Sequence, residues 1–282
     1  MPRSHELYES VYHQPNRFSF GRNWQDYLNS LTPSRIKAAE ASLVDWLGSG
    51  LKGKTFVDIG CGSGLFSLAA YRLGAKSVVS VDVDQFSLDC ARELRQREGA
   101  PAHWEVSAGS ALDPKFLKTL GKFDIVYSWG VLHHTGDMDQ ALTNVSKLVG
   151  KDGQLFIALY NDNHRVLEGT SAFWLRAKQF YNSGSNWRKR AIEAVYTVYY
   201  IIGLVFNGIN PVNYIKNYDS LRGMSFFIDI RDWLGGLPYE YATTQSIIDF
   251  FAARGFDSQK VVKARSIGCN EFLFRRHRDH HE

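Results

Sequence analysis

Three glycines alternate as Gly60, Gly62 and Gly64, directly after a short apolar segment that contains Asp58. Because glycine has no Cβ, a turn built from it lets the backbone approach a ligand closely. Asp82 stands at the end of a second apolar segment. An acidic side chain about 20 residues beyond such a turn suits the two hydroxyls of a ribose. These residues predict a nucleoside pocket at the carboxyl edge of a parallel sheet.

The glycine spacing indicates which kind of nucleoside would bind. A dinucleotide site needs G-x-G-x-x-G, with a pyrophosphate on the helix that follows. Here Leu65 and Phe66 follow Gly64, and the third glycine of that pattern is missing. No Lys-Ser or Lys-Thr pair follows either, which excludes a P-loop. A glycine turn without a phosphate clamp fits a nucleoside whose tail is an amino acid.

Residues 56–64 resemble motif I of the class I S-adenosylmethionine (SAM)-dependent methyltransferases, and the resemblance extends over roughly residues 50–160. It continues through the segment that ends at Asp82, through Gly109-Ser110-Ala111, through residues 123–135 and through the turn at residues 151–155. It implies SAM as the cofactor. Cofactor contacts are then expected from Asp58, Gly60, Cys61, Gly62, Gly64, Leu65, Asp82, Val83, Ser110, Ala111, Trp129 and Leu132.

The charges of SAM assign roles to several of these residues. Asp58 could attract the ammonium group directly or through water. The backbone amides after Gly62 and Gly64 suit the carboxylate, because a helix N-terminus favours anions. In similar proteins an acidic residue often stands where this chain has Ser110, so adenine recognition is left to the Ser110 hydroxyl and nearby backbone.

Two adjacent histidines, His133 and His134, follow the fourth predicted strand. Methyl transfer is an in-line displacement, so the protein mainly supplies alignment and a dry site. A general base is needed only if the acceptor must lose a proton, and an imidazole suits that role near neutral pH. Alternatively, His133 caps the loop or contacts the adenine side and His134 makes a structural hydrogen bond. We expect His134 to face the acceptor, with Tyr160 and Asn161 as further residues of the acceptor pocket.

Alternating apolar strands and helices must position these residues. Strands are expected at 55–59, 78–82, 103–106, 123–128 and 154–160, and a hairpin at 259–264 and 269–275. Helices are expected at 33–47, 64–73, 85–97, 113–120, 138–148 and 243–254. This order indicates a parallel sheet covered on both faces. The predicted fold is a Rossmann-like, doubly wound, seven-stranded α/β fold, and the resemblance implies an antiparallel last strand.

Four segments are expected along the chain. They are an N-terminal helical cap (1–50), a SAM-binding core (51–161), a helical lid insertion (162–236) and a completion of the core (237–282). In the cap, Phe20 and Trp24 either roof the cofactor pocket or pack on the sheet. Near the end of the insertion and just after it, Arg222, Asp229 and Tyr239 either line the acceptor pocket or anchor the lid.

The insertion is rich in aromatic residues. Phe173, Ala177 and Phe180 recur at helical spacing, which is more typical of a core face than of a binding site. The apolar run at 194–206 is shorter than the roughly 20 residues that a membrane-spanning helix needs. It is either a buried lid helix or an interfacial helix with a basic flank, in which case residues 187–206 would contact a membrane peripherally.

Composition is ordinary for a soluble globular protein, with 44% apolar and 22% charged residues. A net charge of +4 with no concentrated basic stripe gives little reason to expect a nucleic-acid partner. Three scattered cysteines without a C-x-x-C pair indicate a reducing compartment and no zinc site. The polar N-terminus does not resemble a signal peptide, so we expect a cytoplasmic, metal-free protein.

The sequence therefore predicts transfer of a methyl group from SAM to an oxygen or nitrogen of a small or amphipathic acceptor. Two alternatives stay open: a SAM-binding regulatory or scaffold protein without turnover, and a methyltransferase that acts on RNA. The acceptor, the attacking atom, the use of a base and the oligomeric state are also open.

Overall fold

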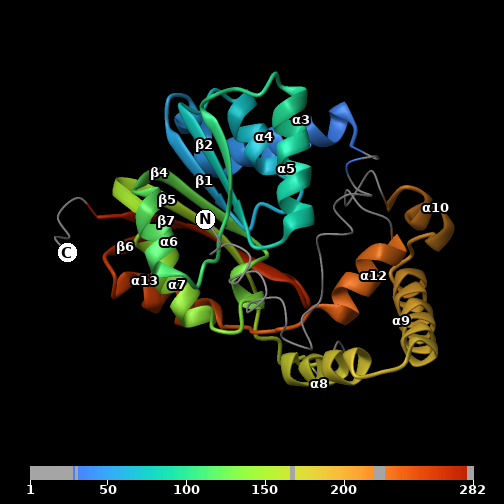
Figure 1. Cartoon of the computed structure of the whole chain (residues 1–282). Coiled ribbons are helices and arrows are strands. Elements are labelled where there is room, and N and C mark those ends of the chain that lie inside the picture. Colours follow the sequence, from blue (N-terminus) through green and yellow to red (C-terminus); the bar gives the residue numbers. More distant parts are fainter. Residues whose placement is uncertain (1–27, 29–30, 166–168, 219–225, 278–282) are drawn as a thin grey trace.

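The computed structural model describes residues 28, 31–165, 169–218 and 226–277 (Figure 1). One seven-stranded sheet forms its centre, in the order β3-β2-β1-β4-β5-β7-β6. The strands are β1 (Thr55–Ile59), β2 (Ser77–Asp82), β3 (Trp104–Ala108), β4 (Phe123–Trp129), β5 (Val149–Tyr160), β6 (Phe256–Val262) and β7 (Cys269–Arg276). Neighbouring strands from β3 to β5 pair in parallel, and β7 is antiparallel to both β5 and β6. The predicted Rossmann-like fold, with its antiparallel last strand, is confirmed.

Strand order reverses between β1 and β4, because the chain builds outward to β3 and then returns to the other side of β1. In such sheets ligands bind beyond the carboxyl ends of the strands at this reversal. The residues that follow β1, β2, β4 and β5 therefore meet at one edge of the sheet.

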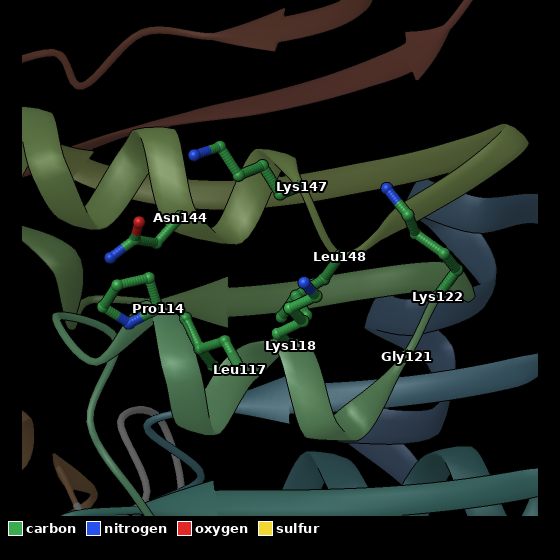
Figure 2. Close-up of a pocket in the computed structure, with 8 residues that line it drawn as sticks. All are labelled: Pro114, Leu117, Lys118, Gly121, Lys122, Asn144, Lys147 and Leu148. Carbon is green, nitrogen blue, oxygen red and sulfur yellow. The ribbon is translucent and has the colours of Figure 1, made fainter. Parts of the chain in front are cut away.

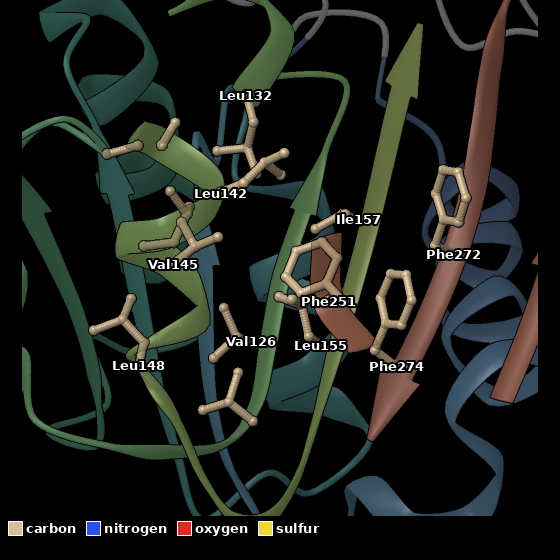
Figure 3. Packing of buried hydrophobic residues seen from close by; sticks show 14 of the residues in the cluster. Val126, Leu132, Leu142, Val145, Leu148, Leu155, Ile157, Phe251, Phe272 and Phe274 are labelled. Atoms are coloured by element: carbon tan, nitrogen blue, oxygen red, sulfur yellow. The ribbon is translucent and has the colours of Figure 1, made fainter. Parts of the chain in front are cut away.

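Helices cover both faces of the sheet. The helices α3 (Pro33–Leu47), α4 (Leu65–Arg72) and α5 (Gln85–Arg97) cover one face, and α6 (Pro114–Leu120), α7 (Met138–Ser146) and α13 (Thr244–Ala252) cover the other. Successive residues of β1 point to opposite faces, so Phe56 packs with the first group and Val57 with the second. Figure 3 shows the second layer, where Leu142 and Val145 of α7 face the sheet.

One connection differs from the expectation. A turn was expected at residues 151–155 before the fifth strand, but β5 already begins at Val149. Its pairing with β4 shifts between Phe123 and Ile125, whose partners are Val149 and Gln154. The extra residues form a bulge in which Asp152 adopts a φ of 59°. Short glycine-rich segments look like turns in a sequence even when both flanks stay in the ladder.

Between β5 and α13 the described residues form a separate group of helices, which we call the helical insertion. It comprises α8 (Ser171–Asn182), α9 (Asn186–Phe206), α10 (Pro211–Lys216) and α12 (Phe226–Gly235). Figure 1 shows these helices beside the sheet, with α12 nearer to it than α9. They share an apolar core of Trp174, Tyr181, Tyr218, Phe226, Ile230, Leu234, Leu237 and Tyr239.

The expected core face of α8 is wrong. Phe173 and Phe180 are 56% and 57% exposed, whereas Trp174, Lys178 and Tyr181 are buried. Both sets recur at helical spacing, but the set that packs into the core of the insertion is the one that contains Lys178. The buried-helix interpretation of residues 194–206 holds for one side only: Leu204 is buried and Tyr196 and Tyr200 pack partly buried on this core, whereas the other side of α9 is exposed. No helix among the described residues has the length and apolar character to cross a membrane.

Candidate functional site

The glycine turn connects β1 to α4 and needs glycine at two of its positions for packing. Gly60 and Gly64 have φ values of 76° and 78°. A Cβ on Gly60 would lie 2.4 Å from a methyl carbon of Val131, and one on Gly64 would lie 2.8 Å from Cα of Ala91. The turn is thus held tightly between the loop after β4 and helix α5.

Asp82 fixes the same turn from the end of β2. Its Oδ2 accepts a hydrogen bond from the Gly62 amide at 2.9 Å, and its Oδ1 accepts one from the Asp84 amide at 2.8 Å. Each carboxylate oxygen can accept a further bond, so hydroxyls of a ribose could still bind. Burial raises the pKa of Asp82 to about 6.

Asp58 is buried beneath the turn. Its Oδ2 accepts from the Ser67 hydroxyl at 2.8 Å, and Ser67 in turn accepts from Ser80 at 2.7 Å. Burial raises the pKa of Asp58 to about 7, with Asp82 adding to the rise and Ser67 opposing it. No lysine or arginine of the described residues forms an ion pair with Asp58. Asp58 is thus a buried carboxyl group whose ionised form a cation would stabilise, and it lies beneath the glycine turn. This arrangement fits the ammonium end of SAM.

The other expected cofactor residues surround this edge in different ways. Val83 follows Asp82 and is half-buried, and the Ser110 hydroxyl accepts from the Leu112 amide at 3.1 Å. Ala111 and Leu132 belong to the apolar core, and Figure 3 shows Leu132 at its upper end. Cys61 and Leu65 lie in the turn and at the start of α4. Trp129 is 47% exposed, and its indole N–H donates to Glu271 of β7 at 2.7 Å.

The two histidines have opposite tautomers, which we assign from their partners. Nδ1 of His133 accepts from the Tyr160 amide at 3.3 Å, so Nε2 carries its proton. Nδ1 of His134 lies 2.5 Å from the Pro238 carbonyl oxygen, which only accepts, so the lone pair of this ring is on Nε2. His133 is fully buried, and burial holds its pKa well below the usual value. Of the two, only His134 is arranged to act as a base at Nε2.

A compact group of side chains, which we call the Tyr160 cluster, adjoins the histidines. Ring centroids of His133, Tyr239 and Trp233 lie 4.0, 5.0 and 5.6 Å from that of Tyr160. The ammonium of Lys178 lies 4.0 Å from the Trp233 ring centroid and 4.9 Å from that of Tyr239. It donates to the Trp233 carbonyl, is fully buried, and has its pKa lowered by burial to about 7.

Two donors of the Tyr160 cluster are buried without a partner in the described part of the chain. They are Nε2 of His133 and the indole nitrogen of Trp233. A buried donor without a partner costs free energy, so a ligand acceptor atom would be favoured beside it. The cluster thus offers donors and ring faces at the carboxyl edge of β4 and β5.

The remaining expected acceptor residues are not all brought to this cluster. Both ends of the Asn161 amide bind the loop before β7, where the amide donates to Ser266 O at 2.9 Å and accepts from Gly268 N at 3.1 Å. Asp229 accepts from the Tyr218 hydroxyl within the insertion. Phe20, Trp24 and Arg222 lie outside the described residues.

Lys178 and Trp233 were not expected in the site. A signal existed for Lys178, because it shares one helical face with Trp174 and Tyr181 in α8. A lone lysine on an otherwise aromatic face is a candidate for burial beside those rings. Nothing in the local sequence of Trp233 indicated that its ring would meet this lysine.

A pocket of about 360 Å³ lies elsewhere, between α6 and α7 (Figure 2). Lys118, Lys122 and Lys147 line it beside Pro114 and Leu117. It sits where β4 and β5 begin, whereas the glycine turn follows the end of β1. Because these strands are parallel, the pocket and the candidate site are at opposite edges of the sheet.

Known proteins share both sequence and fold with this chain. A family model described as "Methyltransferase domain" matches residues 51–203, more than half of the chain. A ubiquinone biosynthesis O-methyltransferase of Pelagibacter ubique is 34% identical over 111 residues, which cover 39% of this chain and 44% of the relative. The chain spans about half the length of the curated ubiquinone O-methyltransferases it matches.

Two solved structures share the fold over nearly the whole chain. An O-methyltransferase family protein from Burkholderia thailandensis matches with a TM-score of 0.59 and 13% identity, over 98% of this chain and 69% of the other. A magnesium protoporphyrin IX methyltransferase from Synechocystis with bound S-adenosylhomocysteine (SAH) matches with a TM-score of 0.50 and 14% identity, over 96% and 94% of the two chains. At these identities the likeness concerns the fold.

Proposed function

The chain belongs to the methyltransferase domain family and is a class I SAM-dependent methyltransferase, and from this premise we propose that it methylates a hydroxyl oxygen of a phenol or enol on a partly apolar acceptor. When bound, SAM supplies the methyl group from its sulfonium centre. In this proposal Asp82 binds the ribose, Asp58 binds the ammonium group, and the Tyr160 cluster binds the acceptor.

The observation that carries the proposal is the surplus of donors in the Tyr160 cluster. His133 and Trp233 each have a buried N–H group there without a partner, and Lys178 adds an amine that already donates to the Trp233 carbonyl. An oxygen with partial negative charge would satisfy these donors, whereas an amine would bring further N–H groups and leave them unpaired. The rings of Tyr160 and Tyr239 suit a flat, apolar acceptor body. The likeness to ubiquinone O-methyltransferases also favours oxygen over nitrogen.

We assign Lys178 as the base that removes the proton of the acceptor hydroxyl. A hydroxyl that receives a methyl group must lose its proton, and a base works best with a pKa near the working pH. Burial lowers the pKa of Lys178 to about 7, so its neutral amine is present near neutral pH. After taking the proton, the ammonium would stabilise the oxygen that forms the new bond. Nε2 of His134 is the second candidate for this role.

The reaction can be tested without knowing the acceptor. The purified protein is incubated with cell-extract fractions and SAM that carries carbon-13 in its methyl group. We expect a new methoxy carbon signal by NMR, with a matching mass gain in one fraction. A labelled N-methyl signal would contradict the choice of oxygen. Tight SAM binding with no transfer to any fraction would favour a regulatory protein instead.

The assignment of Lys178 can then be tested on the identified acceptor. In the wild type kcat/KM should rise with pH, reach half of its maximum near pH 7 and level off above it, because the neutral amine is the active form. Lys178→Met should remove that rise and lower turnover about a hundredfold or more. Burial holds the folded-state pKa below the unfolded value, so protonation of Lys178 opposes folding and Lys178→Met should not lower stability at neutral pH.

Lys189→Met, on the insertion but outside the Tyr160 cluster, is the matched control and should leave the pH profile unchanged. If His134→Gln removes the rise with pH while Lys178→Met keeps it, His134 is the base and the assignment of Lys178 is wrong.

A further inference from the structure

One long face of α9 is apolar and exposed. It presents Val195, Val198, Tyr199, Ile202, Val205 and Phe206, which are between 48% and 87% exposed. Their spacing of one and three residues places them on the same side of the helix. The opposite side holds the helix to the insertion, because Ile192, Tyr196 and Tyr200 pack against its core.

Further large apolar side chains are exposed on α9 and on the helices next to it in the chain. They are Trp187 at the start of α9, Phe173 and Phe180 on α8, Ile209 just before α10 and Val212 in α10. Together with the six residues above we call these the apolar outer face. Figure 1 shows α9 at the outer edge of the molecule, with α12 between it and the sheet. An exposed apolar face that runs along a helix, as on α9, indicates a binding surface.

The charges around the apolar outer face have one sign. Over residues 171–216 the partly or fully exposed cations are Arg176, Arg188, Lys189, Arg190 and Lys216. Glu193 is the acidic residue of that range, and its carboxylate is already bound by the Tyr181 hydroxyl at 2.6 Å and by Arg231 at 3.3 Å. The helices that carry the face therefore have an excess of positive charge, which is concentrated at residues 188–190 near the start of α9 and which we call the basic rim.

We propose that the apolar outer face docks on a bilayer that contains anionic lipid, with α9 lying in the plane of the interface. Interfacial helices combine an apolar face with basic residues at its border, and α9 has this composition. The basic rim would meet anionic headgroups while Trp187 and the valines enter the headgroup boundary. A second copy of the chain is a poorer occupant, because a symmetric contact would bring two positive rims together. This proposal stands apart from the choice of acceptor.

Vesicle flotation with the full chain tests the proposal. Vesicles of phosphatidylcholine with phosphatidylglycerol should carry the protein to the top of a density gradient, and vesicles of phosphatidylcholine alone should carry much less. The double variant Val198→Glu/Val205→Glu should lose flotation. Arg190→Glu should weaken binding at least about fivefold, the factor expected for one cation at an anionic surface. The matched control is Val44→Glu on α3, which is 45% exposed and outside the insertion, and it should float like the wild type.

Three outcomes would overturn the proposal. The first is wild-type protein that stays at the bottom with anionic vesicles. The second is a Val198→Glu/Val205→Glu variant that floats like the wild type while keeping its thermal unfolding midpoint and SAH affinity. The third is concentration-dependent dimerisation by sedimentation, abolished by the same variant, without any flotation. That third result would assign the face to a second copy of this chain.

Discussion

Two carboxyl groups lie at the glycine turn: Asp58 is buried and Asp82 is partly buried, and two effects raise the pKa of Asp58. Burial is the larger cause and the negative charge of Asp82 adds to it. The sequence placed both residues at one sheet edge, because each stands at or near the end of a strand. It could not indicate that Asp58 would be half protonated near pH 7, since that depends on how deeply the fold buries it.

Cofactor binding should therefore be linked to proton release at Asp58. The folded-state pKa, about 7, is above the usual 3.8, so the neutral form dominates below pH 7. An ammonium group favours the ionised form, and SAH carries the same ammonium group as SAM. SAH affinity should rise as the pH increases to about 7 and level off above it, and protons should be released on binding below that plateau. Calorimetry in two buffers of different ionisation enthalpy measures that release.

Asp58→Asn is the variant that tests this linkage. It should weaken SAH binding about tenfold or more, since one pKa unit corresponds to a factor of ten, and it should abolish the proton release. Without SAH, ionising Asp58 and Asp82 opposes folding, because both folded-state pKa values are raised. The free protein should lose stability as pH rises from about 4 to 7. A wild-type protein that binds SAH with no proton release at pH 6 would contradict the role of Asp58.

At the scale of elements, the strands of the sheet were predictable from the sequence, but the buried side of each insertion helix was not. Strand β1 is a short apolar run between Gly53 and Gly60, β2 is one that follows Gly74, and the helix predicted at 85–97 is α5 itself. In α8 two faces competed, and the exposed one carries Phe173 and Phe180. Hydrophobic periodicity identifies a helix but chooses its buried side only when the other side is polar.

The same reasoning explains what was missed in the site. Tyr160 was placed correctly at the end of a strand, because strand ends follow from the alternation of the sheet. The Tyr160 cluster also needs Lys178 and Trp233, which come from α8 and α12. Their meeting depends on how the insertion helices pack, and no local pattern encodes that packing.

The glycine turn makes a prediction at this scale. Gly60→Ala should abolish measurable SAH binding and lower stability by about 2–4 kcal/mol, because the new Cβ overlaps Val131 and the φ of 76° is strained for alanine. Gly99→Ala is the matched control, with a φ of 81° and no atom within 4 Å of the added Cβ. It should cost about 1 kcal/mol and leave SAH affinity unchanged. Denaturant unfolding and calorimetry give the two quantities, and equal effects of both substitutions would show that backbone strain alone matters.

At the scale of the whole molecule, a short stretch at residues 238–242 joins the insertion to the sheet. The Pro238 carbonyl accepts from His134, and the Glu240 amide donates to the His133 carbonyl at 3.0 Å. The Ala242 amide donates to the Tyr160 carbonyl at 3.1 Å. This stretch contacts both histidines and the end of β5, so movement of the insertion would shift residues of the Tyr160 cluster.

Glu240 is the residue through which we expect the insertion and the sheet to be coupled. Its two carboxylate oxygens accept from the amides of Gly136 and Met138, both at 3.1 Å, where α7 begins. A carboxylate at a helix N-terminus is favoured by the unpaired amides there. Glu240→Ala leaves those amides without their partner and should lower stability by about 1–3 kcal/mol.

Hydrogen exchange distinguishes a simple helix cap from a coupling element. In Glu240→Ala, amides of residues 132–138 and of α12 should exchange faster together, while those of α3 keep the wild-type rate. The matched control is Glu93→Ala on α5, which removes an exposed partner of Arg97. It should leave hydrogen exchange in residues 132–138 and in α12 unchanged and should alter stability by about 0.5 kcal/mol or less. Faster exchange confined to residues 136–138 would mean that Glu240 only caps α7. Faster exchange in α12 as well means that this one carboxylate holds the insertion against the edge where the Tyr160 cluster lies, so acceptor binding and insertion movement are linked.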